Sequence, residues 1–179
     1  IGSFSTTAIT TALYVGSGAS FLDIRNNIFA NTMTGNNASQ KNYAIYLSTD
    51  YRSLEPLLKE NNIPSEKIFF IDTLTSEVQT PPKLDNCIFV QSPSALTEIS
   101  LAFSDALSSK GCDVILIDSI STLLIYQDVH SIIRFSQTLM TKGRVMNKKL
   151  VFVALKEDSE GLVKDISMFV DKIIDYTKP

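Results

Sequence analysis

A single aspartate at the end of an apolar run is the residue of this chain best placed to do chemistry. Val114–Ile117 are four consecutive branched apolar residues, and Asp118 follows them directly. Because no polar residues alternate with these, the run predicts a strand buried on both faces, as in a parallel sheet covered by helices. Open α/β sheets bind their ligands at the carboxyl ends of such strands. The sequence therefore predicts that Asp118 lies at a ligand-binding edge of a sheet.

Two roles for Asp118 fit this stretch. An apolar strand that ends in Asp has the form of a Walker B motif, whose carboxylate holds a Mg²⁺ ion, directly or through water, beside the phosphates of a nucleotide. Ser119, Ser121 and Thr122 follow, and Asp and Ser are also preferred at turns and helix N-termini. In that second role Asp118 only caps the next turn. Both roles stay open on the sequence.

A short glycine turn, Gly16–Ser20, follows the first expected strand. A phosphate-binding P-loop needs Gly-x-x-x-x-Gly-Lys-[Ser/Thr], because backbone N–H groups wrap the phosphates while Lys neutralises them. If Gly18 is the second glycine, Ala19 replaces the Lys and Leu13 stands where the first glycine belongs. Ser20 can still stand at the Mg²⁺-binding position, and such a turn before a helix binds anions weakly. The residues of this degenerate phosphate loop are Gly16, Ser17, Gly18 and Ser20.

Segments with strand and helix spacing alternate along the chain. This alternation indicates a parallel sheet with right-handed crossovers, so we predict an α/β protein, a three-layer α/β/α sandwich with a mostly parallel sheet. The expected strands cover residues 8–15, 43–47, 67–71, 87–90, 114–117, 150–155 and 170–176. The expected helices cover residues 21–29, 54–60, 92–110, 128–142 and 158–169. Residues 31–41 and 76–85, the latter with Pro81 and Pro82, are expected to be connections.

Composition excludes several classes of function. The 179 residues are most simply one domain, 1–179, and a formal net charge of −3 argues against autonomous nucleic-acid binding. The two cysteines, Cys87 and Cys112, form neither a metal-like cluster nor a disulfide framework, and they suit a reducing cytoplasm. No apolar run approaches the roughly 20 residues that span a bilayer. The chain begins at Ile1 without a Met, so it is compatible with a fragment of a longer protein.

Five segments of this chain follow one another in the order of the core strands of a known family. They are residues 43–50, 67–72, 114–123, 150–155 and 170–175. With them the chain resembles the RecA-like ATPase core, in the branch that contains the circadian clock protein KaiC and its archaeal relatives. The resemblance covers most of the chain from Tyr43 onward and implies a RecA-like sheet. It places Asp118 at the Walker B position and Asp50 at that of the acid that polarises the attacking water. The glycine turn departs from the family's pattern, so the resemblance is to a member with a degenerate Walker A motif.

Other strand-end residues have alternative roles. Asp50 also fits an N-cap for the helix that follows it, and Asp72 and Asp175 are expected to form turns. Lys156 follows the strand over 150–155; with Asp50 and Asp118 it is similar to the two acids and lysine of a phosphoacceptor receiver domain. Such a domain, however, is shorter and carries its phosphorylated Asp on the third strand.

The basic residues give no clear site. Arg52, Arg134 and Arg144 could bridge subunits in a ring, whereas singly each fits an exposed surface charge. His130 is expected to be exposed near the start of a helix, with nothing to pair it to a nucleophile.

Three functions follow, and we favour the first. It is a non-hydrolysing RecA/KaiC-like domain, a regulatory or protein-interaction module that binds a protein partner or its own copies and needs no cofactor. The second is an ATPase that binds ATP and Mg²⁺ with a cation from Lys156, an upstream segment or a neighbouring subunit's arginine. The third is a receiver-like signalling module with its chemistry at Asp118. Catalysis is not expected for the first function. Nucleic acid and membranes are not expected as partners of this chain, and its expected location is cytoplasmic.

Overall fold

The structure of the protein is a computed structural model that describes residues 11–16, 43–48, 51–53, 55–60, 65–110, 112–155 and 160–175. The helix predicted over 21–29 and the connection predicted over 31–41 lie outside the described residues.

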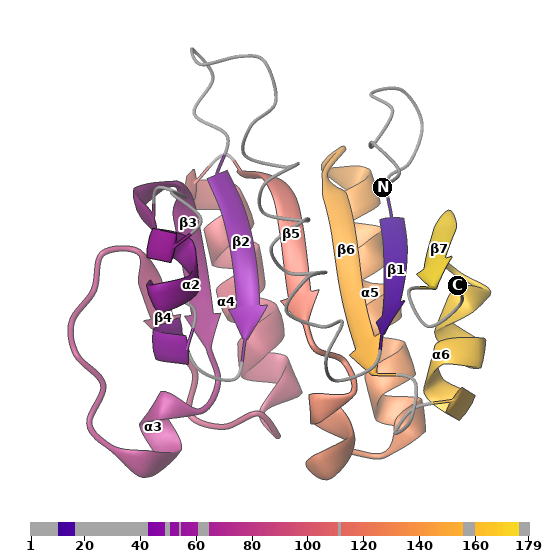
Figure 1. Ribbon diagram of the computed structural model, residues 1–179, viewed down its shortest axis with the longest axis horizontal. Helices are drawn as coiled ribbons and strands as arrows, with labels where there is room; N and C mark the ends of the chain where they lie inside the picture. Colours follow the sequence, from indigo (N-terminus) through magenta and orange to yellow (C-terminus); the bar gives the residue numbers. More distant parts are fainter. Residues whose placement is uncertain are drawn as a thin grey trace.

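Seven strands form one sheet in which every pair of neighbours is parallel (Figure 1). The order across the sheet is β4-β3-β2-β5-β6-β1-β7. The strands are β1 Thr11–Gly16, β2 Tyr43–Ser48, β3 Ile68–Asp72, β4 Cys87–Phe89, β5 Cys112–Asp118, β6 Lys149–Leu155 and β7 Lys172–Asp175. The predicted strands are confirmed wherever the structure describes them, and the sheet is parallel as expected.

The described helices are α2 Glu55–Glu60, α3 Thr75–Val78, α4 Leu96–Lys110, α5 Val129–Val145 and α6 Glu160–Ser167. All of these except α3 lie where the sequence predicted a helix. Short 3₁₀ turns lie at Tyr51–Ser53, Ser65–Lys67 and Thr122–Ile125. None of the described helices is long and apolar enough to cross a membrane.

The prediction that residues 76–85 form only a connection is wrong at its start, because α3 occupies Thr75–Val78. The physical reason is local: the Asp72 carboxylate accepts hydrogen bonds from the Leu74 and Thr75 amides and so winds the chain into a turn. A helix of four residues is too short to show periodicity in the sequence.

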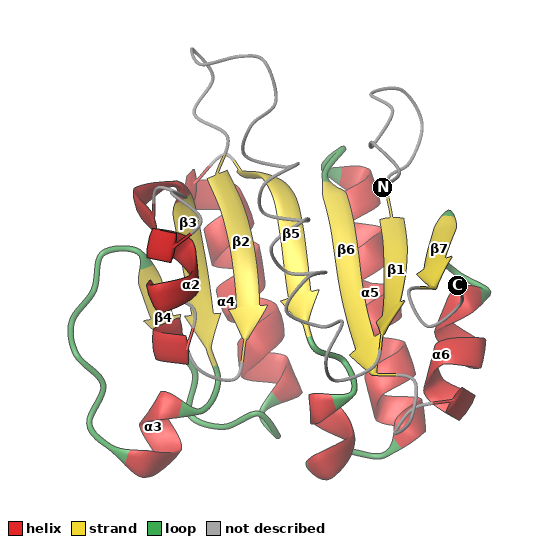
Figure 2. Cartoon of the chain, in the orientation of Figure 1, coloured by secondary structure: helices red, strands yellow, loops and turns green. Residues whose placement is uncertain are grey.

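The sheet separates two layers of helix, with α4 and α5 on one face and α2 on the other (Figures 1 and 2). Successive side chains of a strand point to opposite faces. On β5, Ile115 and Ile117 belong to the large core beneath α4 and α5, so Leu116 and Asp118 face the α2 side. All three apolar residues are at most 1% exposed. The strand is therefore buried on both faces, as its unbroken apolar run predicted.

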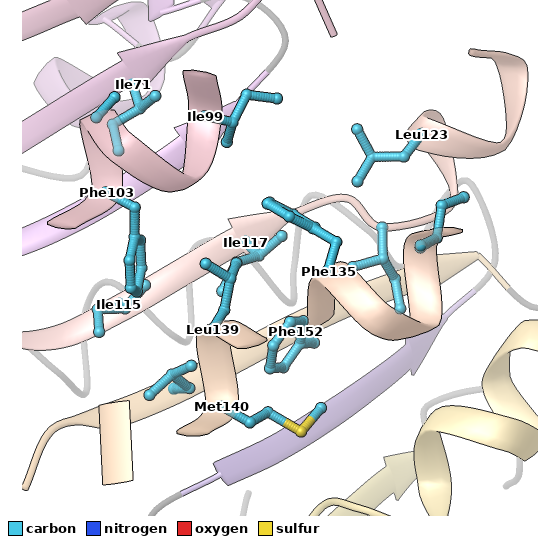
Figure 3. Close-up of a cluster of buried hydrophobic side chains, with 14 of the residues drawn as sticks. Ile71, Ile99, Phe103, Ile115, Ile117, Leu123, Phe135, Leu139, Met140 and Phe152 are labelled. Atoms are coloured by element: carbon cyan, nitrogen blue, oxygen red, sulfur yellow. The ribbon is translucent and has the colours of Figure 1, made fainter. Parts of the chain in front are cut away.

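The large core contains ten residues that Figure 3 labels. They are Ile71, Ile99, Phe103, Ile115, Ile117, Leu123, Phe135, Leu139, Met140 and Phe152. The same cluster extends to Leu162 and Ile166 of α6, so one core unites both halves of the sheet.

Helix α5 approaches β6 closely at Gly143. A Cβ atom added to Gly143 would lie 1.9 Å from Cδ1 and 3.1 Å from Cγ of Leu150, a residue that is 1% exposed. The helix can sit at this distance from the strand only because residue 143 has no side chain.

We therefore expect Gly143→Ala to lower the free energy of unfolding by about 1–3 kcal/mol, since Leu150 must leave its position in a packed core. Gly161→Ala in α6 is the matched control, because nothing lies within 4 Å of the added Cβ. That control should stabilise the protein by about 0.5–1 kcal/mol through its helix propensity. Urea unfolding of the two variants measures both effects, and equal stability of the two would contradict the close approach.

Candidate functional site

The carboxyl ends of the central strands bring Asp118 and Asp72 to one edge of the sheet. Ser48 of β2 pairs in register with both Asp72 of β3 and Asp118 of β5. In the order across the sheet, β3 and β4 lie on one side of β2, whereas β6 lies on the other side of β5. The connections after β2 and after β5 therefore run in opposite directions across the sheet. Such a switch point is where open α/β sheets form their ligand crevice. Asp118 lies at the carboxyl end of a central strand, as the sequence predicted.

Asp118 is a buried carboxylate, 2% exposed, at the start of a tightly held turn. The peptide bond between Asp118 and Ser119 is cis. Ser119 Oγ lies 3.0 Å from Thr122 Oγ1 and accepts a hydrogen bond from Thr122 N at 3.3 Å. Hydroxyls that bond to the backbone in this way stabilise turns, so the serine-rich sequence after Asp118 fixes the direction in which the chain leaves β5.

The same turn is also fixed to the neighbouring strand β6. The Ile120 amide donates to the carbonyl of Val153 at 3.0 Å, and the Leu155 amide donates to Ser121 Oγ at 2.8 Å. Ser121 is itself buried. These two bonds continue the β5–β6 pairing beyond the end of β5 and make the edge around Asp118 rigid.

Asp72 forms the most extensive hydrogen-bond centre at this edge among the described residues. Its carboxylate is fully buried and accepts four hydrogen bonds, each of 2.8–2.9 Å. The donors are the amides of Tyr51, Leu74 and Thr75 and the hydroxyl of Thr75. A buried carboxylate is tolerated when its oxygens are hydrogen-bonded in this way. The prediction that Asp72 forms a turn is confirmed.

The bond from Tyr51 to Asp72 was not predicted, because it joins residues 21 apart in sequence. It ties the segment after β2 to the loop after β3. The Tyr51 ring also packs edge-on against Phe89, at 5.6 Å between centroids, and lies 6.2 Å from the Phe70 ring. The only sequence signal was the Asp-x-x-Thr spacing of Asp72 and Thr75, which indicates the local turn and not the distant partner.

Cys87 lies beside Asp72 on the neighbouring strand. Burial, together with the nearby Asp72 charge, raises the pKa of the Cys87 thiol to about 12. Cys87 and Cys112 are both buried and neither is in a disulfide, as predicted. The Cys87 thiol is therefore held protonated and is a poor nucleophile.

The described residues do not by themselves fit a Mg²⁺ ion. The carboxylate of Asp72 already accepts four hydrogen bonds from its own turn and from Tyr51, so Asp72 holds the backbone rather than an ion beside Asp118. No group of three or more His, Cys, Asp or Glu residues gathers elsewhere in the described part of the chain.

Several predicted site residues lie outside the described residues, namely Ser17, Gly18, Ser20, Asp50 and Lys156. Of the degenerate phosphate loop, the structure describes Gly16, which ends β1 and pairs in register with Leu155 of β6. The turn after β1 and the residue after β6 therefore start from adjacent strand ends. Asp175 ends β7, at the margin of the sheet beside β1.

Of the basic candidates, Arg52 lies at this edge, exposed in the 3₁₀ turn after β2, with its guanidinium carbon 6.0 Å from the centre of the Tyr51 ring. Arg144 and Arg134 lie elsewhere. Arg144 donates from Nη2 to the carbonyl of Phe169 at 2.7 Å and lies 3.4 Å from Asp171 Oδ1. Asp171 bonds to the backbone at the start of β1, so Arg144 is at the opposite end of the sheet. Arg134 is exposed on α5, and His130 is exposed in the first turn of that helix, as predicted.

The receiver-like alternative does not match the sheet. Receiver domains have the strand order 2-1-3-4-5, in which the first strand lies between the second and third. Here β1 lies between β6 and β7, on the far side of β5 from β2. The similarity of Asp50, Asp118 and Lys156 to a receiver's site therefore has no counterpart in the fold.

Comparison with known proteins establishes the fold. No protein-family model matches the sequence, and no curated protein is similar to it. Among solved structures, the chain is similar to a KaiC-like protein from the hyperthermophilic archaeon Pyrococcus horikoshii, with a TM-score of 0.65 and 14% sequence identity. The match covers 93% of this chain and 72% of that chain. The RecA/KaiC-like α/β fold predicted from the sequence is confirmed, and identity this low carries no activity with it.

Removal of the Asp72 carboxylate should strongly destabilise the protein. Asp72→Ala leaves four donors without their acceptor, and we expect the free energy of unfolding to fall by about 3 kcal/mol or more. Asp105→Ala, at an exposed position of α4, should change stability by no more than about 0.5 kcal/mol. Urea denaturation measures both variants. If Asp72→Ala were as stable as Asp105→Ala, Asp72 would not hold this edge together.

The Cys87 thiol should make the folded state less stable at alkaline pH. In the unfolded chain the thiol ionises near its ordinary pKa of 9.0, whereas in the folded chain it stays protonated up to about 12. The stabilising contribution is thus complete below pH 9 and is lost as the pH rises from about 9 to 12. Urea unfolding across this range should show a steeper loss for the natural chain than for Cys87→Ala. Parallel curves for the two proteins would contradict the raised pKa.

Proposed function

We propose that this chain is a non-hydrolysing RecA/KaiC-like domain that acts as a regulatory or protein-interaction module. The observation that supports this proposal most is that the fold resembles that of KaiC-like proteins, whereas one segment of the sequence does not match the P-loop motif. The parallel sheet and the Asp118 strand end are present, whereas the sequence after β1, Gly16–Ser20, has neither the Lys nor the glycine spacing of a P-loop.

The physical reason is electrostatic. In P-loop proteins the backbone amides and the Lys of this loop cradle the β- and γ-phosphates and offset their charge. Asp118 supplies a carboxyl group and no cation to the edge of the sheet, so the phosphates of a nucleotide would need a cation from elsewhere. Arg144, the basic candidate with a defined ion pair, is engaged with Asp171 at the opposite end of the sheet. Tight binding of ATP is therefore not expected, and no ATP hydrolysis follows.

One observation favours a second candidate function, a nucleotide-binding ATPase with a cation from elsewhere. Gly16 and Leu155 are register partners at the ends of β1 and β6, and Lys156 is the next residue after Leu155 in the sequence. A lysine that follows β6 is thus the basic residue best placed in the sequence to replace the missing P-loop Lys. In that case ATP and Mg²⁺ would be the cofactors, with Asp118 as the carboxylate beside the ion.

Thermal unfolding with and without millimolar Mg-ATP or Mg-ADP separates the two functions. A ligand at 100 times its Kd stabilises a protein by about 2.7 kcal/mol, which for a domain of this size raises Tm by roughly 5–10 °C. We expect no shift with either nucleotide and no release of phosphate from ATP.

Two variants make this measurement specific. A rise in Tm that disappears in Asp118→Ala, together with release of phosphate from ATP, would refute the non-hydrolysing module, and loss of the rise in Lys156→Ala would identify the replacement cation. Asp105→Ala, exposed on α4, is the control that should behave as the natural chain does. The Tm of each variant with nucleotide is compared with the Tm of the same variant without nucleotide, so a change in its basal stability does not affect the measured shift.

A further inference from the structure

The segments that follow β2, β3, β4 and β5 are joined to one another by hydrogen bonds at the carboxyl edge of the sheet. In Figure 1, helix α3 lies on the side of the molecule toward which the arrowheads of these strands point. Several of the bonds join residues far apart in the sequence, so they do not follow from local turn formation. They connect the turn after Asp118 with the turn after β2.

The first connection leaves the turn after Asp118 at Gln127. The Gln127 amide donates to the carbonyl of Leu123 at 2.9 Å, which makes Gln127 the end of that turn. Its side-chain Nε2 donates to the carbonyl of Ser94 at 2.8 Å, across 33 residues of sequence. Ser94 lies two residues before α4. This bond therefore fixes the turn after β5 to the segment that leads from β4 into α4.

Ser92 carries the connection on to α3. Its hydroxyl accepts from the Ser94 amide at 3.2 Å, lies 2.9 Å from Ser94 Oγ and donates to the carboxylate of Glu77, a residue of α3. A serine hydroxyl has one proton to donate and two lone pairs that accept. With its proton on Glu77 and its lone pairs toward Ser94, the Ser92 hydroxyl is fully used in joining the two segments.

Helix α3 completes the connection to the turn after β2. The Glu77 amide donates to the carbonyl of Leu74 at 3.0 Å, and the Leu74 amide donates to the Asp72 carboxylate at 2.9 Å. The same carboxylate accepts from the Tyr51 amide at 2.9 Å. A continuous series of hydrogen bonds thus leads from Gln127 to Tyr51. We call it the edge relay, and its members are Gln127, Ser94, Ser92, Glu77, Leu74, Asp72 and Tyr51.

The bonds of the edge relay differ in their exposure to solvent. Asp72 is fully buried, whereas the Gln127–Ser94 and Ser92–Glu77 bonds lie at the surface. An exposed hydrogen bond exchanges readily for bonds to water, so its net contribution is small and it opens locally without unfolding of the core. The relay therefore opens at its exposed bonds, while Asp72 keeps its own turn in place.

We propose that the edge relay is a conformational device that couples the turn after Asp118 to the turn after β2, with Ser92 as its junction. While Ser92 is bonded to Glu77, both turns are held in one arrangement, and when that bond opens both turns gain freedom together. A molecule that binds one turn and favours one of these two states therefore changes the other turn as well. The relay is a property of the chain itself and does not depend on the function proposed above.

Amide hydrogen exchange of the ¹⁵N-labelled full chain, followed by NMR without nucleotide, tests this coupling. We expect Ser92→Ala to raise the exchange rates of the Tyr51, Leu74 and Gln127 amides by roughly 2- to 10-fold, which corresponds to the loss of one modest hydrogen bond. These amides lie in the relay but do not touch the Ser92 hydroxyl, so a purely local effect of the substitution would leave them unchanged.

Gln127→Ala tests the relay from its other end. This variant should raise the exchange rates of the Glu77 and Gln79 amides, which belong to α3 and its C-terminus and have no bond to Gln127 among the hydrogen bonds of the described residues. The double variant Ser92→Ala/Gln127→Ala should exchange at α3 no faster than Ser92→Ala alone, because the relay is already open. Independent sites would instead give additive effects.

Ser108→Ala is the matched control, because the Ser108 hydroxyl donates to the carbonyl of Ser104 on the exposed surface of α4 and lies outside the relay. It should leave the exchange rates of all relay amides unchanged. The proposal is overturned if Ser92→Ala affects only residues 90–98, if the two substitutions are additive at α3, or if the amides of Ile115–Ile117 accelerate equally, since that result indicates global destabilisation. The nucleotide melts test the proposed function separately, and neither result decides the other.

Discussion

Burial of β5 on both faces is the constraint on which the rest of this structure depends. Ile115, Leu116 and Ile117 lose almost all of their contact with water, so helices must cover both sides of the strand. Helices can cover both faces of a sheet when neighbouring strands are parallel and are joined by crossovers. All the carboxyl ends then fall on one edge, and Asp118 is placed there. The candidate site thus lies at this edge because the apolar residues of β5 must be buried on both faces of the sheet.

The two buried aspartates at this edge differ in what surrounds them. Asp72 accepts four hydrogen bonds from its own turn and from Tyr51, so its carboxylate is fully used in holding two loops together. Asp118 lies at the switch point between β2 and β5, with the serine-rich turn after it fixed to β6. Two acids at the ends of parallel strands therefore differ in role: Asp72 holds two loops together, whereas Asp118 begins a turn that is fixed to the next strand.

The likeness to a KaiC-like protein concerns the arrangement of strands and helices, at 14% sequence identity. A fold determines where a site lies, whereas the residues of its loops determine what the site does. In this chain the strands and helices are arranged similarly to those of that KaiC-like protein, and the sequence after β1, Gly16–Ser20, contains no lysine.

The sequence by itself determined the class of fold, the position of nearly every strand and the placing of Asp118 at a strand end. These follow from the local spacing of apolar residues, such as Val114–Ile117 and Leu150–Leu155, because solvent exclusion acts on each segment separately. The turn at Asp72 was also predictable, since Thr75 lies within its local reach. Only the tertiary structure decided that β6 lies between β5 and β1, that Asp72 holds Tyr51, and that Gly143 lets α5 reach Leu150. Each of those contacts joins residues from different elements of the chain. The periodicity of apolar residues does not predict such contacts, because it carries no information about which elements meet.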